Sequence, residues 1–380
     1  MKNKTIYLLS SDRWGTMRVS KHHYALELAE KGNKVFFIEP PDLQNKGISI
    51  LPSEDHPSLF IVKYKPVFRG RRFLPGIVFR LFLILQIRIL IGKIGQRPDI
   101  VWCFDPYRFN NLNWFKASGK IFFAADLFYY DHLPEEALTA DLCLGVSDTI
   151  VELLKPACKP AHFINHGVSR HFINIAKETL AQLPAINQPK SKITVGYVGN
   201  LLMEAPDRNT MQNVISTHSD IQFIFWGQYE RKGNFVAYDK PEVFGFIKFL
   251  QSQPNVVLRG AVHPSVLSEE IRKADLFWIC WQTSVNKMWD GSNSHKILEY
   301  LSTGKPVVSH YMSTYRNGNI IDMLPSKGNN DYLSLFSQVL NRVKAGEPVD
   351  LHRKRILLAM DNSYQSHIAE IEKLIQPHFS

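Results

Sequence analysis

Residues 293–309 read NSHKILEYLSTGKPVVS, and they join a short helical pattern to a short apolar strand. Ser294 has the side chain expected of a helix N-cap, and Gly304 stands where a helix often ends in a left-handed residue. Pro306 cannot continue a helix, so the run Val307–Ser309 is expected to be a buried strand. The stretch predicts one helix-then-strand step of an α/β fold.

The same alternation continues on both sides of this stretch. Continuous apolar runs are typical of parallel strands that are covered on both faces. In the second half the predicted strands are Ile193–Tyr197, Gln222–Trp226, Val256–Arg259, Leu276–Cys280 and Val307–Ser309. In the first half they are Thr5–Ser10, Lys34–Ile38, Asp99–Phe104, Lys120–Ala125, Leu142–Val146 and His162–Asn165. The first helix is predicted over Thr16–Lys31, with Gly32 as its C-cap.

A chain of 380 residues exceeds the size of one hydrophobic core, which predicts two domains. The pattern fades over residues 183–191, a polar stretch punctuated by prolines as linkers are. We therefore predict an α/β chain of two tandem, doubly wound, Rossmann-like domains, over residues 1–185 and 186–354. Residues 355–380 should form a helix that packs back on the first domain. Ligands of such domains bind beyond the carboxyl ends of the strands, here expected across a cleft between the domains.

Composition and motifs exclude several classes of protein and enzyme. Hydrophobic content of 45% and charged content of 21% are those of a soluble globular protein. The four cysteines have no metal spacing and are expected to be reduced core thiols in the cytosol. The apolar run at the N-terminus is too short for a signal peptide. The sequence has no GxGxxG after its first strand and no GxxxxGK[ST], HExxH or GxSxG motif, which argues against several common enzyme classes.

The opening stretch also suggests a binding site. A helix that begins at Ser294 would present free amide groups to an anion, with Lys296 in its first turn. Glu299, one turn further on, could accept hydrogen bonds from a ribose diol. An ordinary amphipathic helix with solvated Lys296 and Glu299 explains the pattern equally well.

The stretch resembles the donor-site motif of glycosyltransferase family 4, a Lys and a Glu followed by Tyr-Leu-x-x-Gly-Lys-Pro-Val-Val. The chain also resembles bacterial transferases of cell-surface polysaccharide synthesis, the teichuronic-acid type among them. The resemblance implies the GT-B fold and gives Glu299 the role of binding the ribose of a nucleotide sugar. The family often has a second Glu eight residues earlier. Here Gly291 stands there, which leaves the neighbouring Asp290 as the candidate for contacting the sugar.

The resemblance extends to other stretches of the second half. The strand and glycine turn at Gly199 and Asn200, with Gly227 after the next strand, imply backbone close to the donor. In the family a basic residue after that second strand contacts the diphosphate, so Arg231 or Lys232 is a candidate. A charged surface loop is the alternative for both residues.

Candidates for the acceptor side lie in the first half. Trp14 and Arg18 border the first helix, and His166 stands at the predicted corner between the domains, where the family has Asn. His22 and His23 could supply a general base near neutral pH, although a histidine on a packed helix is more often structural. Asp126 follows a strand, and it could bind the acceptor or cap the next segment.

One segment carries nearly all of the net charge of +10, because no acidic residue lies between Asp55 and Asp99. The nine basic residues in this gap are Lys63, Lys65, Arg69, Arg71, Arg72, Arg80, Arg88, Lys93 and Arg97. The apolar run over residues 74–93 is interrupted by Arg80 and Arg88, which argues against a spanning helix. Residues 63–97 suit an anionic membrane surface, whereas a buried helix with basic ends is the alternative. Nucleic-acid binding is not expected, since the basic residues alternate with aliphatic ones.

Together these observations predict a cytoplasmic glycosyltransferase, and the basic segment favours a peripheral position on the inner membrane face. It would move a sugar from a nucleotide-sugar donor to a glycan or lipid-linked acceptor in cell-surface polysaccharide synthesis. The family resemblance implies retention at the anomeric carbon, no metal and no cofactor beyond the donor. The alternatives are a nucleotide-sugar epimerase on the same fold and a non-catalytic scaffold with a decayed donor site.

Overall fold

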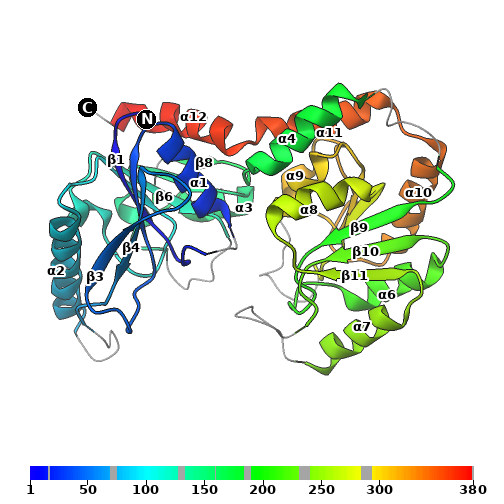
Figure 1. Cartoon of the computed structure of the whole chain (residues 1–380), viewed down its shortest axis with the longest axis horizontal. Coiled ribbons are helices and arrows are strands. Elements are labelled where there is room, and N and C mark those ends of the chain that lie inside the picture. The colour runs from blue at the N-terminus through cyan, green and yellow to red at the C-terminus, as the bar shows by residue number, and fades with distance from the viewer. Residues whose placement is uncertain are drawn as a thin grey trace. The chain divides into compact units, whose positions relative to one another are not determined.

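The computed structural model describes residues 1–15, 18–68, 75–126, 133–158, 160–183, 190–230, 240–283 and 293–378. The chain forms two compact units, Met1–Asn165 with Tyr364–Ser380, and His166–Ser363. Of the predicted linker at 183–191, residues 184–189 lie outside the described residues. The chain passes from the first unit to the second at residue 166, and it returns to the first at residue 364. Each unit is an α/β domain (Figure 1).

The first unit contains an eight-stranded sheet in the order β3-β4-β2-β1-β5-β6-β7-β8, parallel except for the β3–β4 pair. Its strands are β1 Thr5–Leu9, β2 Lys34–Ile38, β3 Ile48–Pro52, β4 Leu59–Tyr64, β5 Ile100–Cys103, β6 Gly119–Ala124, β7 Leu142–Gly145 and β8 Ala161–Phe163. Its helices include α1 Ser20–Glu30, α2 Gly76–Ile94, α3 Asp148–Leu154 and α12 Tyr364–Ile375. The predicted helix start at Thr16 lies outside the described residues, and α1 begins at Ser20 because Val19 is still extended.

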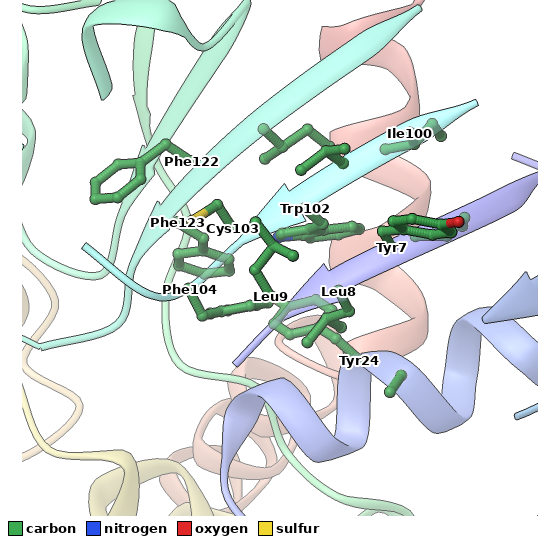
Figure 2. Close-up of a cluster of buried hydrophobic side chains, with 14 of the residues drawn as sticks. Tyr7, Leu8, Leu9, Tyr24, Ile100, Trp102, Cys103, Phe104, Phe122 and Phe123 are labelled. Carbon is green, nitrogen blue, oxygen red and sulfur yellow. The ribbon is translucent and has the colours of Figure 1, made fainter. Parts of the chain in front are cut away.

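Aromatic side chains fill the core of this unit (Figure 2). Tyr24 of α1 lies 5.1 Å from Trp102 of β5, measured between ring centroids, and Phe104 lies 5.1 Å from Phe123. The C-terminal helix α12 closes the same core, with Tyr364 edge-on to Tyr24 at 4.9 Å. The C-terminal segment is therefore part of the first Rossmann-like unit although it is remote in sequence.

The second unit contains a six-stranded parallel sheet in the order β11-β10-β9-β12-β13-β14. Its strands are β9 Thr194–Val198, β10 Gln222–Trp226, β11 Val256–Gly260, β12 Leu276–Ile279, β13 Val307–Ser309 and β14 Asp322–Met323. Its helices include α4 Arg170–Ala181, α6 Arg208–Thr217, α7 Pro241–Ser252, α8 Pro264–Glu270, α9 His295–Leu301, α10 Tyr332–Ala345 and α11 Val349–Asp361. Two parallel-dominated sheets with helices between their strands confirm the prediction of two Rossmann-like domains.

The sequence analysis did not predict three of the strands. The pair β3 and β4 forms an antiparallel connection at one edge of the first sheet, with no helix between the strands. Strand β14 has only two residues. Among the described residues, no helix has the length and apolarity that crossing a membrane requires.

Candidate active site

Three glycines lie at the carboxyl ends of neighbouring strands in the second unit. Gly199 follows β9, Gly227 follows β10 and Gly260 ends β11. The Gly199 amide donates to the Trp226 carbonyl (2.9 Å), and the Gly227 amide donates to the Gly260 carbonyl (2.8 Å). Gly227 has a φ of +140°, and a Cβ there would lie 1.9 Å from the Gly199 carbonyl oxygen. No side chain fits at this point, because the turns after β9 and β10 lie backbone against backbone.

Helix α9 contains Lys296 and Glu299, two of the residues that the sequence assigned to the donor. Ser294 is its N-cap, and its Oγ accepts from the Lys296 amide at 3.4 Å, which confirms the predicted cap. The Lys296 Nζ lies 3.0 Å from Glu299 Oε2, and the two side chains are 21% and 16% exposed. A partly shielded ammonium and carboxylate thus lie together, one suited to a phosphate and the other to sugar hydroxyls.

Tyr300 attaches α9 to the sheet. Its hydroxyl accepts from the Val198 amide (2.7 Å) and donates to the Val198 carbonyl (3.3 Å). Strand β9 pairs with β12 only as far as Gly196, so these two groups of Val198 have lost their strand partner. The Tyr300 ring also stacks on Phe277 of β12 at 4.3 Å. Because Val198 directly precedes Gly199, this contact fixes Glu299 relative to the glycine turn.

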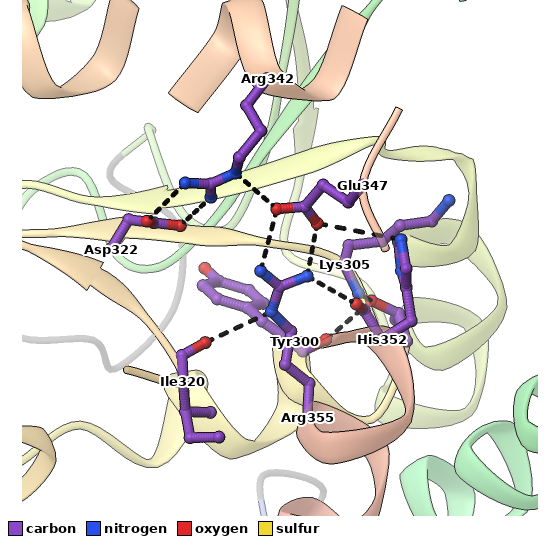
Figure 3. Close-up of polar contacts among 10 residues, drawn as sticks. Tyr300, Lys305, Ile320, Asp322, Arg342, Glu347, His352 and Arg355 are labelled. Carbon is purple, nitrogen blue, oxygen red and sulfur yellow. Dashed lines mark hydrogen bonds and ion pairs between the residues drawn. The ribbon is translucent and has the colours of Figure 1, made fainter. Parts of the chain in front are cut away.

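A buried ion-pair network supports the other end of α9 (Figure 3). Arg355 of α11 donates to the carbonyl of Gly304, the residue at which α9 is predicted to stop, at 3.2 Å. Both of its terminal nitrogens contact the Glu347 carboxylate, at 2.6 and 3.1 Å. Burial opposes ionisation of Glu347, but hydrogen bonds from Arg355 and the nearby Arg342 guanidinium lower its pKa. Arg342 also pairs with Asp322, which extends the network to β14.

Two further histidines of the second unit lie close to the donor motif. His166, predicted as a cleft residue, is buried and lies edge-on to His295 at 5.9 Å. His295 begins α9, and its Nε2 lies 3.9 Å from Glu299 Oε1. The structure therefore brings His166 near the donor motif through His295. Asn200 forms the turn after Gly199, where its Oδ1 accepts from the Leu202 amide at 2.9 Å.

The sequence analysis missed His310. It follows β13 directly, at the carboxyl edge of the sheet, and it is fully buried. The Trp281 amide donates to its Nδ1 at 3.3 Å, and burial lowers its pKa to about 4. Within the described part of the chain, its Nε2 has no hydrogen-bond partner. The sequence feature that could have identified His310 is its position directly after Ser309, at the end of the donor motif.

In the first unit, Asp55 holds Trp14 and Arg18 together. The Trp14 Nε1 and the Arg18 guanidinium donate to Asp55 Oδ2 at 3.1 and 2.7 Å. The Arg18 guanidinium lies over the Trp14 ring at 4.1 Å, and the Trp14 amide donates to Glu39 Oε1 at 2.8 Å. Both predicted acceptor residues therefore have fixed positions in the loop after β1.

The two histidines proposed as general bases have packing contacts. His22 is buried, its Nδ1 accepts from the Val19 amide (3.1 Å), and its Nε2 lies 3.0 Å from the Arg13 carbonyl. Burial lowers the pKa of His22 to about 4. Both ring nitrogens therefore hold the loop before α1, which favours the structural alternative for this residue. His23 stacks on Tyr364 at 4.9 Å.

Lys21 is a second residue that the sequence analysis missed. Its Nζ donates to Ser11 Oγ at 2.6 Å and pairs with Asp12, and the side chain is 9% exposed. Although burial opposes it, the Lys21 charge lowers the pKa of Asp12. Asp105, after β5, is fully buried, and burial raises its pKa despite Arg108 at 2.8 Å. Asp126, two residues after β6, is exposed.

The predicted sugar contact Asp290 and the predicted diphosphate contacts Arg231 and Lys232 lie outside the described residues. Within the described ranges, no cluster of three or more His, Cys, Asp or Glu side chains could hold a metal ion.

Comparisons with known proteins give a likeness in structure alone. No family model and no curated protein matches the sequence. A trehalose-6-phosphate synthase from E. coli bound with UDP-2-fluoro glucose has a TM-score of 0.69 and 11% identity, over 98% of this chain and 99% of that one. Sucrose-phosphate synthase from Thermosynechococcus elongatus has a TM-score of 0.66 and 13% identity, over 99% of both chains. Anabaena HepE in complex with UDP and glucose has a TM-score of 0.63 and 10% identity, over 98% of this chain and 100% of that one. The chain therefore has the two-domain GT-B fold of glycosyltransferases.

Proposed function

We propose that this protein is a glycosyltransferase whose second unit binds a nucleotide-sugar donor. The observation that carries the proposal is the attachment of α9 to β9 by Tyr300. It holds Glu299 and Lys296 near the glycine edge formed by Gly199 and Gly227. This combination offers backbone for close approach, a cation for a phosphate and a carboxylate for a ribose.

In the proposed reaction, the bond between the anomeric carbon and the diphosphate breaks. The acceptor oxygen forms the new bond to that carbon, and its proton passes to the departing diphosphate. The departing diphosphate takes up negative charge, which Lys296 and the amino end of α9 stabilise. The Glu299 carboxylate accepts hydrogen bonds from the ribose hydroxyls and thereby positions the donor. We propose that the reaction needs no metal and no cofactor beyond the donor, and that the anomeric configuration is retained.

We propose that the acceptor is a glycan or a lipid-linked sugar of cell-surface polysaccharide synthesis and that it binds to the first unit. The residues after β1, which include Trp14, Arg18 and Lys21, are suited to hydroxyl-rich ligands. A lipid-linked acceptor would place a cytoplasmic protein at the inner membrane face, and residues 63–97 supply a basic segment for that surface.

Donor binding can be tested by thermal unfolding against a panel of nucleotides and nucleotide sugars. A ligand at about 100 times its dissociation constant adds roughly 2.7 kcal/mol of stability, which corresponds to a shift of roughly 5–10 °C. We expect one diphosphate family to stabilise the wild type and the Glu299→Ala variant to lose that shift.

Glu269→Ala is the matched control, because Glu269 also pairs with a cation three residues away but lies 65% exposed on α8. The control should keep the whole shift. Equal shifts in the wild type and in Glu299→Ala would contradict the assigned donor site. A panel with no shift at all, with acceptor and vesicles present, would favour a scaffold.

A further inference from the structure

Helix α2 exposes a row of large apolar side chains. Ile77, Leu81 and Leu85 are 76%, 62% and 44% exposed, and Val78 and Ile89 are 36% and 37% exposed. Spacings of four residues place them on one face of the helix. Isolated apolar residues on a surface are ordinary, but a row of five on one helix marks an interaction site.

The opposite face of α2 is already used for packing. Gln86, Ile87 and Leu90 are its buried residues, and Gln86 Oε1 accepts from the Val67 amide at 2.7 Å. The helix is therefore fixed to the first unit through one face, at the margin of that unit (Figure 1). Rotation about its axis cannot bury the exposed row without breaking these contacts.

The charge of the segment indicates what covers the exposed face. Arg88 lies among the exposed apolar residues, and Lys93 borders them one turn later. No acidic residue occurs between Asp55 and Asp99. Apolar side chains interspersed with basic ones are complementary to an anionic bilayer, where the apolar groups enter the acyl boundary and the cations meet the headgroups. A second copy would instead bring like charges together, which is unfavourable.

We infer that the outward face of α2 binds an anionic lipid bilayer, with the helix axis lying along the membrane surface. This inference deepens the proposed function, since it places the first unit on the surface that would carry a lipid-linked acceptor. The inference rests on the proposed function only for the role that membrane binding would serve, because binding to the bilayer requires no donor. With 19 residues that include Arg80, Arg88 and Lys93, α2 suits the interface rather than the bilayer interior.

Co-sedimentation of the full chain with vesicles tests the inference. We expect binding to vesicles of phosphatidylcholine with phosphatidylglycerol, and little binding to phosphatidylcholine alone. Salt should weaken the binding, since screening shortens the range of the headgroup charge. A Leu81→Asp, Leu85→Asp double variant should have a binding constant for the vesicles that is lower by about tenfold or more, because its apolar contact is lost. Arg88→Gln with Lys93→Gln should lower the binding constant roughly tenfold or more.

The matched control is Leu357→Asp with Val266→Asp, which places the same charges at helix positions 42% and 49% exposed in the second unit. This control should sediment like the wild type. Loss of binding in the α2 variants alone would support the inference. Binding that all variants retain would overturn it, as would a folded wild type that binds no vesicles or that dimerises through α2 instead. Vesicle binding without any response to nucleotide sugars would support the inference while contradicting the proposed function.

Discussion

At the residue scale, the backbone at Gly227 leaves no room for a side chain. A Cβ there would lie 1.9 Å from the Gly199 carbonyl oxygen, and its φ of +140° disfavours any side chain. We predict that Gly227→Ala lowers the free energy of unfolding by about 3 kcal/mol or more and removes the donor-induced thermal shift.

Gly245→Ala is the control for this prediction, because a Cβ at Gly245 in the middle of α7 meets nothing within 4 Å. Here alanine should raise the free energy of unfolding by about 0.5–1 kcal/mol. Chemical denaturation of both variants measures the two changes. A Gly227→Ala protein as stable as the wild type would contradict the tight approach of β9 and β10.

The Tyr300 hydroxyl gives a second prediction at this scale. Tyr300→Phe keeps the stack on Phe277 but leaves the Val198 amide and carbonyl without their partner. We expect a loss of about 1–3 kcal/mol in unfolding free energy and a weaker donor affinity. Tyr107→Phe, at a position 54% exposed, should change neither quantity appreciably. Titration calorimetry with the stabilising nucleotide would show an unchanged affinity in Tyr300→Phe if this attachment were unimportant.

Some site residues could be predicted from sequence and others could not. The Ser294 cap and the glycine turns depend on local spacing, which a single sequence displays. Lys21 and His310 depend on three-dimensional neighbours, because Asp12, Ser11 and Trp281 make them notable. The contacts of the two ring nitrogens of His22 with backbone groups could not be predicted from the sequence either.

At the element scale, α9 depends on the C-terminal helices of its unit. Arg355, Glu347 and His352 are all buried, and Arg355 connects Glu347 to the Gly304 carbonyl. Removing one member of a buried ion pair leaves the other charge uncompensated. We predict that Arg355→Gln lowers the free energy of unfolding by about 3–5 kcal/mol.

Arg353→Gln, an exposed position on the same helix, is the control and should change stability by less than about 0.5 kcal/mol. Urea denaturation at pH 7 compares the two. Similar midpoints for both variants would show that the network does not support α9.

Most of the strands that were predicted correctly contain a continuous apolar run, such as that of β2 or β10. Strand β3 alternates between half-buried and exposed residues and ends in Pro52, so its pattern resembles a loop. Helix α2 shows a different limit of sequence reasoning. The sequence favoured a segment on a membrane surface and left a buried helix as the alternative, and only the packing of α2 shows that one of its faces lies outside the core.

At the scale of the whole molecule, stability should depend on pH through buried histidines. Burial lowers the pKa of His22 and of His310 to about 4, against about 6.5 in an unfolded chain. The unfolded state therefore binds more protons below pH 6.5, and the free energy of unfolding falls as the pH drops toward 4. Each of the two histidines can lower the free energy of unfolding by up to about 3 kcal/mol between pH 6.5 and pH 4.

We predict that His310→Gln makes the change in unfolding free energy between pH 7 and pH 5 smaller than in the wild type. Comparing the two proteins cancels the contribution of the carboxyl groups. An unchanged pH dependence would mean that His310 is already protonated, or accessible to protons, in the folded state.

The sequence also predicted the class of the whole molecule, because two series of alternating strands and helices leave few alternatives to paired Rossmann-like domains. The sequence analysis predicted that a helix over residues 355–380 packs back on the first domain, but local pattern alone could not show that this helix begins at Tyr364. Residues 349–375 form two helices on either side of a unit boundary, and both are simply helical in sequence.

Acceptor-dependent release of nucleoside diphosphate from a labelled nucleotide sugar tests the central claim most directly. The wild type, assayed with lipid-linked and soluble glycan acceptors, should transfer the sugar and should continue to do so in EDTA. Glu299→Ala should lose about 100-fold or more in kcat/KM, while Glu269→Ala should match the wild type. Conversion of the donor without an acceptor would instead indicate an epimerase. Full transfer by Glu299→Ala would contradict the proposed donor site.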